Sequence, residues 1–150
     1  MTLHIRPARP ADLEQLTALL GLLFAIEADF HPDPERQRQG LALLIASPAA
    51  CVLVAEAAGE VVGMATGQVT ISTAEGGPAL LVEDVVVAGT WRGKGLGKKL
   101  LARLEEWAAA RGIRRLQLLA DRDNQPALDF YQRLGWGNTA LVCLRKRVSP

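Results

Sequence analysis

A glycine-rich turn between an apolar strand and an amphipathic helix constrains this chain more than any other feature. Residues 82–88 are apolar apart from Glu83 and Asp84 and are rich in β-branched side chains, which predicts a buried strand. Residues 92–97 follow with the sequence Arg-Gly-Lys-Gly-Leu-Gly, and from Leu96 onward apolar residues recur on one helical face. The helix is therefore expected to begin inside the glycine run.

Such a turn has the properties of an anion-binding site. The first N–H groups of a helix lack internal partners, and the helix dipole places partial positive charge beside them. Glycine lets a phosphate approach the backbone closely, because no Cβ stands in the way. Positive side chains surround the turn at Arg92, Lys94, Lys98 and Lys99. The stretch predicts a pyrophosphate cradle, and a glycine-rich turn without a ligand is the alternative.

The spacing of the glycines excludes two common phosphate loops. A P-loop needs a serine or threonine hydroxyl where this chain has Lys99, and a dinucleotide-binding turn needs a different glycine spacing and a distant acidic residue. The pattern Gln/Arg-x-x-Gly-x-Gly/Ala does fit, at Arg92, Gly95 and Gly97. This pattern resembles the acetyl-CoA signature of the GCN5-related N-acetyltransferase (GNAT) family.

Length and composition indicate a single globular domain over residues 1–150. Of these residues 49% are hydrophobic, and the net charge of +1 gives no footprint for nucleic-acid binding. The first ten residues lack the apolar core of a signal peptide, and polar residues interrupt the apolar stretch 41–58. We therefore expect a cytoplasmic protein with neither a membrane nor a nucleic acid as partner.

The two cysteines, Cys51 and Cys143, lie in apolar surroundings that predict buried strand thiols. Their separation suggests neither a disulfide framework nor a zinc site, and no metal is expected.

Hydrophobic periodicity and breaker residues predict the order β-α-α-β-β-β-α-β-α-β. Strands are expected at 3–7, 51–57, 61–71, 82–88, 114–120 and 141–147. Helices are expected at about 10–27, 34–46, 96–111 and 126–134, with Asp33 and Asn124 as caps of the second and fourth. This order predicts an α/β fold with a mixed, mostly antiparallel twisted sheet, helices on both faces and one β-α-β crossover.

A second stretch resembles the same family. Residues 124–136 fit the pattern Asn-x-x-Ala-x-x-Phe-Tyr-x-x-x-Gly-Phe, with Trp136 in place of the last aromatic residue. Two motifs in the right order are more specific than either alone, and the element order also agrees. The resemblance therefore covers nearly the whole chain and is weakest in its first 50 residues.

The resemblance implies a set of residues that bind acetyl-CoA as co-substrate. Backbone groups of Val85 and Val87 would bind the pantetheine arm, where the strand splays from its parallel neighbour. Asn124 and Phe130 would contact the cofactor beside the short helix. The pyrophosphate would be held by the turn residues Arg92, Gly93, Lys94, Gly95, Leu96, Gly97 and Lys98.

The resemblance also implies acid and base roles. Tyr131, the only tyrosine, falls at the position of the acid that protonates the leaving thiolate, and packing of a half-buried aromatic ring is the alternative. Glu83 falls at a position that often serves as base, and a structural ion pair is its alternative. Asp84 is expected to be structural and to point to the opposite face from Glu83. His31 is a lesser candidate for the base.

The predicted function is direct transfer of an acetyl group to the primary amine of a small cationic acceptor, as in the diamine and polyamine branch of the family. Acidic residues around the first interhelical loop, Glu27 and Asp29 above all, would bind that acceptor together with Glu83 and Asp84. The alternatives are a catalytically silent acyl-CoA-binding or regulatory domain and a protein or peptide N-terminal acetyltransferase. The family resemblance also implies a homodimer.

Overall fold

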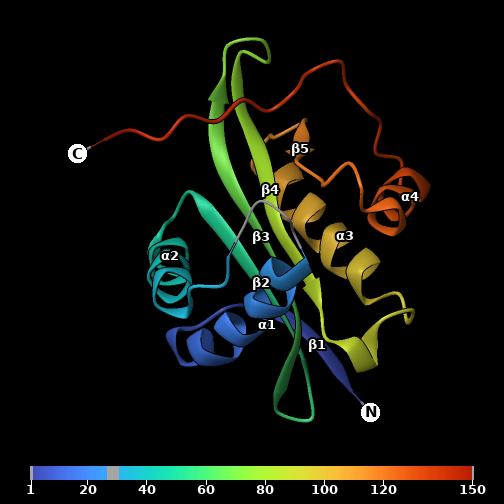
Figure 1. The fold of residues 1–150 in the computed structure, drawn as a ribbon. Helices are drawn as coiled ribbons and strands as arrows, with labels where there is room; N and C mark the ends of the chain where they lie inside the picture. Colours follow the sequence, from blue (N-terminus) through green and yellow to red (C-terminus); the bar gives the residue numbers. More distant parts are fainter. Residues whose placement is uncertain (1, 27–30, 150) are drawn as a thin grey trace. The chain divides into compact units, whose positions relative to one another are not determined.

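The computed structural model describes residues 2–26 and 31–149, which form two compact units divided after Leu118. The first unit contains a five-stranded sheet with the strand order β1-β2-β3-β4-β5 (Figure 1). Neighbouring strands are antiparallel from β1 to β4, and β5 runs parallel to β4. The strands are β1 Leu3–Pro7, β2 Ala50–Ala57, β3 Glu60–Ser72, β4 Gly77–Val87 and β5 Leu116–Leu118.

Three helices of the first unit cover the two faces of this sheet. A short 3-10 turn, Pro10–Asp12, leads into α1 (Leu13–Ile26), and α2 (Pro34–Ala46) follows. A second 3-10 turn, Gly89–Trp91, precedes α3 (Leu96–Ala109), which makes the crossover from β4 to β5. In Figure 1, α1 and α2 lie on one side of the sheet and α3 on the other. The predicted mixed α/β fold is confirmed.

Alternation along β3 shows how the two faces are filled. A Cβ added to Gly63 would lie only 3.1 Å from the side chain of Leu96, so this position faces α3. The next residue, Met64, is fully buried in a cluster with Leu16 and Leu20 of α1 and Leu41 of α2. Each fully buried leucine or methionine contributes about 1.5–3 kcal/mol relative to exposure. One apolar layer, at Gly63, thus packs the sheet against α3, and the other, around Met64, packs it against α1 and α2.

An arginine joins β1, the 3-10 turn and β2. The Arg6 guanidinium donates to both carboxylate oxygens of Asp12, at 2.8 and 2.9 Å, and to Glu56 at 2.7 Å. Asp12 is buried, and the hydrogen bonds from Arg6 hold the pKa of its carboxyl below the ordinary value. The same bonds and charges raise the pKa of Arg6. Arg6 thereby fixes β1, the edge strand, both to β2 and to the 3-10 turn that precedes α1.

The second unit contains α4 (Gln125–Arg133), capped as predicted by Asn124, whose side chain accepts from the Ala127 N–H at 3.3 Å. The strand predicted at 141–147 is absent from the structure. Its apolar residues are exposed instead, Leu141 by 76% and Leu144 by 90%, and Cys143 is exposed rather than buried. A strand needs a neighbour for its N–H and C=O groups, and none of the described residues supplies one. The strand predicted at 114–120 is shorter in the structure, Leu116–Leu118, because only these residues pair with β4.

Within the described residues, no helix is long and apolar enough to cross a bilayer. The expectation of one domain over residues 1–150 stays a prediction.

Candidate active site

The strand that precedes the glycine turn carries a bulge at its two acidic residues. Between the pairs Gly67↔Val82 and Ala65↔Val85, β3 advances by two residues while β4 advances by three. One extra residue of β4 is therefore accommodated at Glu83 and Asp84, which is the definition of a β-bulge.

The bulge places both carboxylates on one face of the sheet. Gln68 donates from its side-chain amide to Glu83 at 3.0 Å, and the Thr66 hydroxyl donates to the Asp84 carboxylate at 3.3 Å. Because Thr66 and Gln68 are two residues apart on one strand, their side chains share a face. The prediction that Glu83 and Asp84 point to opposite faces is therefore wrong, since the extra residue breaks the alternation of β4.

This face is the one covered by α1 and α2. Met64, two residues before Thr66 on β3, packs with Leu16 of α1 in the core cluster. Thr66 is completely buried, whereas Glu83 is exposed. The two acids, which we call the carboxylate pair, thus combine an anchored inner group with an outer group open to solvent.

Beyond the bulge, one edge of β4 has no strand partner among the described residues. Pairing with β5 runs from Leu80↔Leu116 to Val82↔Leu118 and then stops. Val85 and Val87 continue β4 past this point and pair only with β3 on the other side. The parallel pairing thus ends with β5 at Leu118, and the predicted splay of β4 from its parallel neighbour stays a prediction.

The glycine turn takes the predicted form. Gly93 and Gly95 have φ angles of 75° and 79°, which L side chains adopt at a cost, and Gly95 is the N-cap of α3. A Cβ added at either position would meet nothing within 4 Å, so the space over the turn is open. Leu96 is buried and can offer only its backbone N–H. An anion can therefore reach the free N–H groups of the first turn of α3.

Basic side chains flank this turn. Arg92, Lys94 and Lys98 are all exposed. The Lys94 ammonium lies 5.2 Å from the centre of the Trp91 ring, and Arg92 donates to the Val87 carbonyl at 3.3 Å. The positive charge predicted from the sequence is thus present where the helix dipole is also positive.

In the second unit, Tyr131 is half-buried between two aromatic rings. Its ring centre lies 5.2 Å from that of Phe130 and 5.8 Å from that of Trp136, both edge-on. Asn124 caps α4 through its carbonyl oxygen, so any contact with a ligand would use its amide N–H groups.

The acids of the interhelical loop divide into two groups. Glu27 and Asp29 lie outside the described residues. Asp33 caps α2 by accepting from the Arg36 N–H at 3.3 Å, and Glu35 pairs with Arg38 at 3.0 Å, so these two have local structural roles. His31 is exposed. No cluster of three potential metal ligands occurs in the part of the chain that the structure describes.

Sequence reasoning missed Thr66 and Gln68, the partners of the carboxylate pair. Their signal in the sequence was two polar residues, two positions apart, directly after the apolar run 61–65 of the same strand. Gly67 lies between them, and a Cβ there would lie 2.9 Å from the Leu80 side chain, so the strands pack closely at this point.

Solved structures of other proteins share this fold. The closely superimposing solved structures include a possible acetyltransferase from Clostridium difficile 630, with a TM-score of 0.87 and 19% identity over all of both chains. The aminoglycoside 6'-N-acetyltransferase AAC(6')-Ih from Acinetobacter baumannii superimposes with a TM-score of 0.80 and 22% identity, over 99% of this chain and 100% of that one. AAC(6')-Iy, solved with the bisubstrate analogue CoA-S-monomethyl-acetylneamine, gives 0.83 and 21% identity over 99% and 100%.

Sequence comparison gives a short match and a long one. Mouse N-alpha-acetyltransferase 80 is 48% identical over 58 residues, which cover 39% of this chain and 17% of the mouse protein. The match therefore spans only about a sixth of that relative. The sequence model of the acetyltransferase (GNAT) family matches residues 17–136, which include both the glycine turn and the α4 motif. This chain therefore belongs to the acetyltransferase (GNAT) family.

Proposed function

We propose that this enzyme acetylates the primary amine of a small, multiply charged cation. The observation that carries this proposal is the carboxylate pair. Glu83 and Asp84 lie on one sheet face, beside the part of β4 whose outer edge pairs with no strand of residues 2–26 and 31–149. Two neighbouring negative charges attract a cation with more than one positive charge more strongly than a monocation.

The residues of the glycine turn fit acetyl-CoA. Its diphosphate would bind the N–H groups at Leu96, Gly97 and Lys98, with Arg92 and Lys94 neutralising charge. When bound, acetyl-CoA supplies the acetyl group and a thiol as leaving group. Val85 and Val87 would hold the pantetheine arm through backbone groups on the edge of β4 that faces away from β3, where the Val87 carbonyl already accepts from Arg92.

Glu83 is the proton acceptor in this proposal. A protonated amine cannot attack a thioester, so the ammonium group must first lose a proton. Glu83 is exposed and held by Gln68 at 3.0 Å, which leaves its second oxygen open to the acceptor or to a bridging water. Asp84, anchored by Thr66, holds positive charge on the acceptor rather than moving a proton.

Tyr131 is the proton donor. A tyrosine hydroxyl has an ordinary pKa of about 10 and can protonate a leaving thiolate. The α4 motif supports this role, and the rings of Phe130 and Trp136 orient the phenol.

The acceptor class has support from the relatives. The solved structures that superimpose on this chain include aminoglycoside acetyltransferases, which supports a small-molecule amine as acceptor. Glu27 and Asp29 would add negative charge around the acceptor, as the sequence predicts.

A second candidate is acetylation of a peptide N-terminus. The 58-residue match to mouse N-alpha-acetyltransferase 80 has the highest sequence identity among the comparisons described above, and it favours an α-amine as acceptor.

The test is release of free thiol from acetyl-CoA with a panel of amines. The panel contains a diamine and a monoamine of matched length, an aminoglycoside, and peptides with free and blocked N-termini. We expect a higher kcat/KM for the diamine than for the monoamine, and loss of this preference in Glu83→Gln/Asp84→Asn. Preference for the free peptide would favour the second candidate. No thiol release with any amine would show a silent acyl-CoA-binding domain and would refute both candidates.

A further inference from the structure

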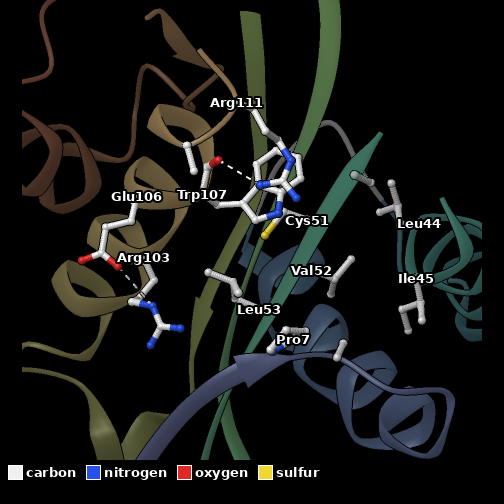
Figure 2. Close-up of a pocket in the computed structure, with 13 residues that line it drawn as sticks. Pro7, Leu44, Ile45, Cys51, Val52, Leu53, Arg103, Glu106, Trp107 and Arg111 are labelled. Carbon is white, nitrogen blue, oxygen red and sulfur yellow. Dashed lines mark hydrogen bonds and ion pairs between the residues drawn. The ribbon is translucent and has the colours of Figure 1, made fainter. Parts of the chain in front are cut away.

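A cavity of about 390 Å³ opens at the edge of the sheet, beside the first residues of β2, which extend past the end of β1 (Figure 2). The last β1 pair joins Pro7 to Leu53, and the Ala8 N–H adds one bond to the Val52 carbonyl at 2.8 Å. β2 starts at Ala50, so its first residues extend beyond β1. The cavity fills this notch between α2 and α3.

The cavity lies far from the proposed acetyl-transfer site. The glycine turn is at the start of α3, whereas the cavity is lined by the second half of that helix and by the residues that follow it. Gly95 and Trp107 are separated by about 18 Å of helix. A ligand in this cavity would therefore bind at the opposite end of α3 from the glycine turn.

The apolar lining of the cavity, which we call its floor, comes from both faces of the sheet edge. Leu44 and Ile45 of α2 lie on the same face as Val52, whereas Leu53, like Cys51, lies on the face that α3 covers. Cys51 completes the floor, and burial raises the pKa of its thiol to about 11, so that it stays neutral and acts as a small apolar group. The floor therefore favours an apolar ligand.

The α3 wall of the cavity is cationic. Arg111 lies with its guanidinium carbon 3.7 Å from the centre of the Trp107 ring and donates to the Trp107 carbonyl at 3.1 Å. Arg103 donates to the Ile5 carbonyl at 3.3 Å and pairs with Glu106 at 3.4 Å. Two guanidinium groups thus face one carboxylate, which leaves one positive charge in excess. Each guanidinium also retains N–H donors beyond those bonds.

We propose that this cavity binds an amphiphilic monocarboxylate, with its apolar tail on the floor and its carboxylate on Arg111 and Arg103. A guanidinium fork matches a carboxylate with two parallel hydrogen bonds. The volume falls within the range of small-ligand sites, at the small end, which suits a medium-chain or arylalkyl acid. An ammonium head would be repelled by the two arginines, and a short acid without a tail would leave the floor empty.

The experiment is calorimetric titration of the full chain, without acetyl-CoA, using sodium octanoate below its micelle concentration. Octylamine carries the same tail with the opposite charge, and acetate carries the head group alone. We expect saturable binding of octanoate at one site and at least tenfold weaker binding of both controls. Equal binding of octanoate and octylamine, or no binding of octanoate, would overturn the proposal.

Variants locate the site. Arg111→Gln removes the charge and keeps the stem, and we expect it to weaken octanoate binding at least tenfold. Ala110→Leu adds bulk to the cavity lining and should weaken binding as strongly. Arg114→Gln changes an exposed arginine outside the cavity and should leave binding unchanged. If circular dichroism shows that Arg111→Gln disturbs the end of α3, Ala110→Leu and Arg103→Gln decide the question. Wild-type affinity in those two variants would overturn the assignment.

Discussion

The buried hydroxyl of Thr66 bridges two groups of one residue, Asp84. It accepts from the Asp84 N–H at 3.1 Å and donates to the Asp84 carboxylate at 3.3 Å. Thr66 is fully buried, so this bridge fixes both the bulged backbone and the inner member of the carboxylate pair. The orientation of a charge proposed to bind substrate thus depends on a residue of the neighbouring strand.

Thr66→Val tests this bridge, because valine keeps the shape of threonine and removes the hydroxyl. We expect the KM for a diamine to rise about tenfold, the equivalent of about 1.4 kcal/mol, with a smaller change for a monoamine. Steady-state kinetics with matched amines measures the effect. Thr66→Ser keeps the hydroxyl and should restore the wild-type KM. If both variants raised KM equally for both amines, packing rather than orientation of Asp84 would explain the result.

Gly95 tests the pyrophosphate cradle. Asparagine and aspartate have nearly the same shape and tolerate a positive φ better than most residues, but only aspartate adds negative charge. We expect Gly95→Asp to abolish measurable acetyl-CoA binding and Gly95→Asn to weaken it less. Calorimetry measures the affinity, and circular dichroism checks that α3 is retained. Undiminished affinity in Gly95→Asp would refute the assignment of the turn.

Tyr131→Phe keeps the ring and removes the proposed proton donor. General acid catalysis typically contributes about 10²–10⁴-fold, so we expect kcat to fall within that range. The affinity for acetyl-CoA should change little, because the ring remains between Phe130 and Trp136. A variant with nearly wild-type kcat would show that the thiolate obtains its proton elsewhere.

Asp12 gives the stability of the first unit a defined pH dependence. Hydrogen bonds from Arg6 lower the pKa of the Asp12 carboxyl in the folded state. A lowered folded-state pKa means that this stabilisation is complete above the unfolded-state value of about 3.9 and is lost as the pH falls through the folded-state value. Asp12→Asn should therefore lower the free energy of unfolding by about 1.5–3 kcal/mol at neutral pH and by less in acid.

Urea denaturation of both proteins between pH 7 and pH 3 measures this difference. Glu14→Gln is the control, since the ion pair of Glu14 with Arg38 lies on the exposed surface and should contribute little. A difference between wild type and Asp12→Asn that stays constant with pH would contradict the assignment.

Local features of this protein could be predicted from its sequence alone. Three such features are the caps at Asp33 and Asn124 and the start of α3 at the glycine turn. Each depends on bonds or φ angles within a few residues. The motif at the glycine turn is also local, since the glycines and the helix N-terminus that together form the anion site are adjacent in the sequence.

The tertiary structure decided what depends on pairing between distant segments. Glu83 and Asp84 share a face only because β4 slips by one residue against β3, and the sequence of β4 cannot reveal a register that its neighbour sets. Residues 141–147 have the composition of a strand, but the structure assigns no strand to them. Strand propensity alone is insufficient, because a strand also needs a neighbouring strand to accept and donate its backbone hydrogen bonds. The cavity beside Cys51 likewise results from where β1 stops, a consequence of how Pro7 and Ala8 meet a strand about 45 residues away in the chain.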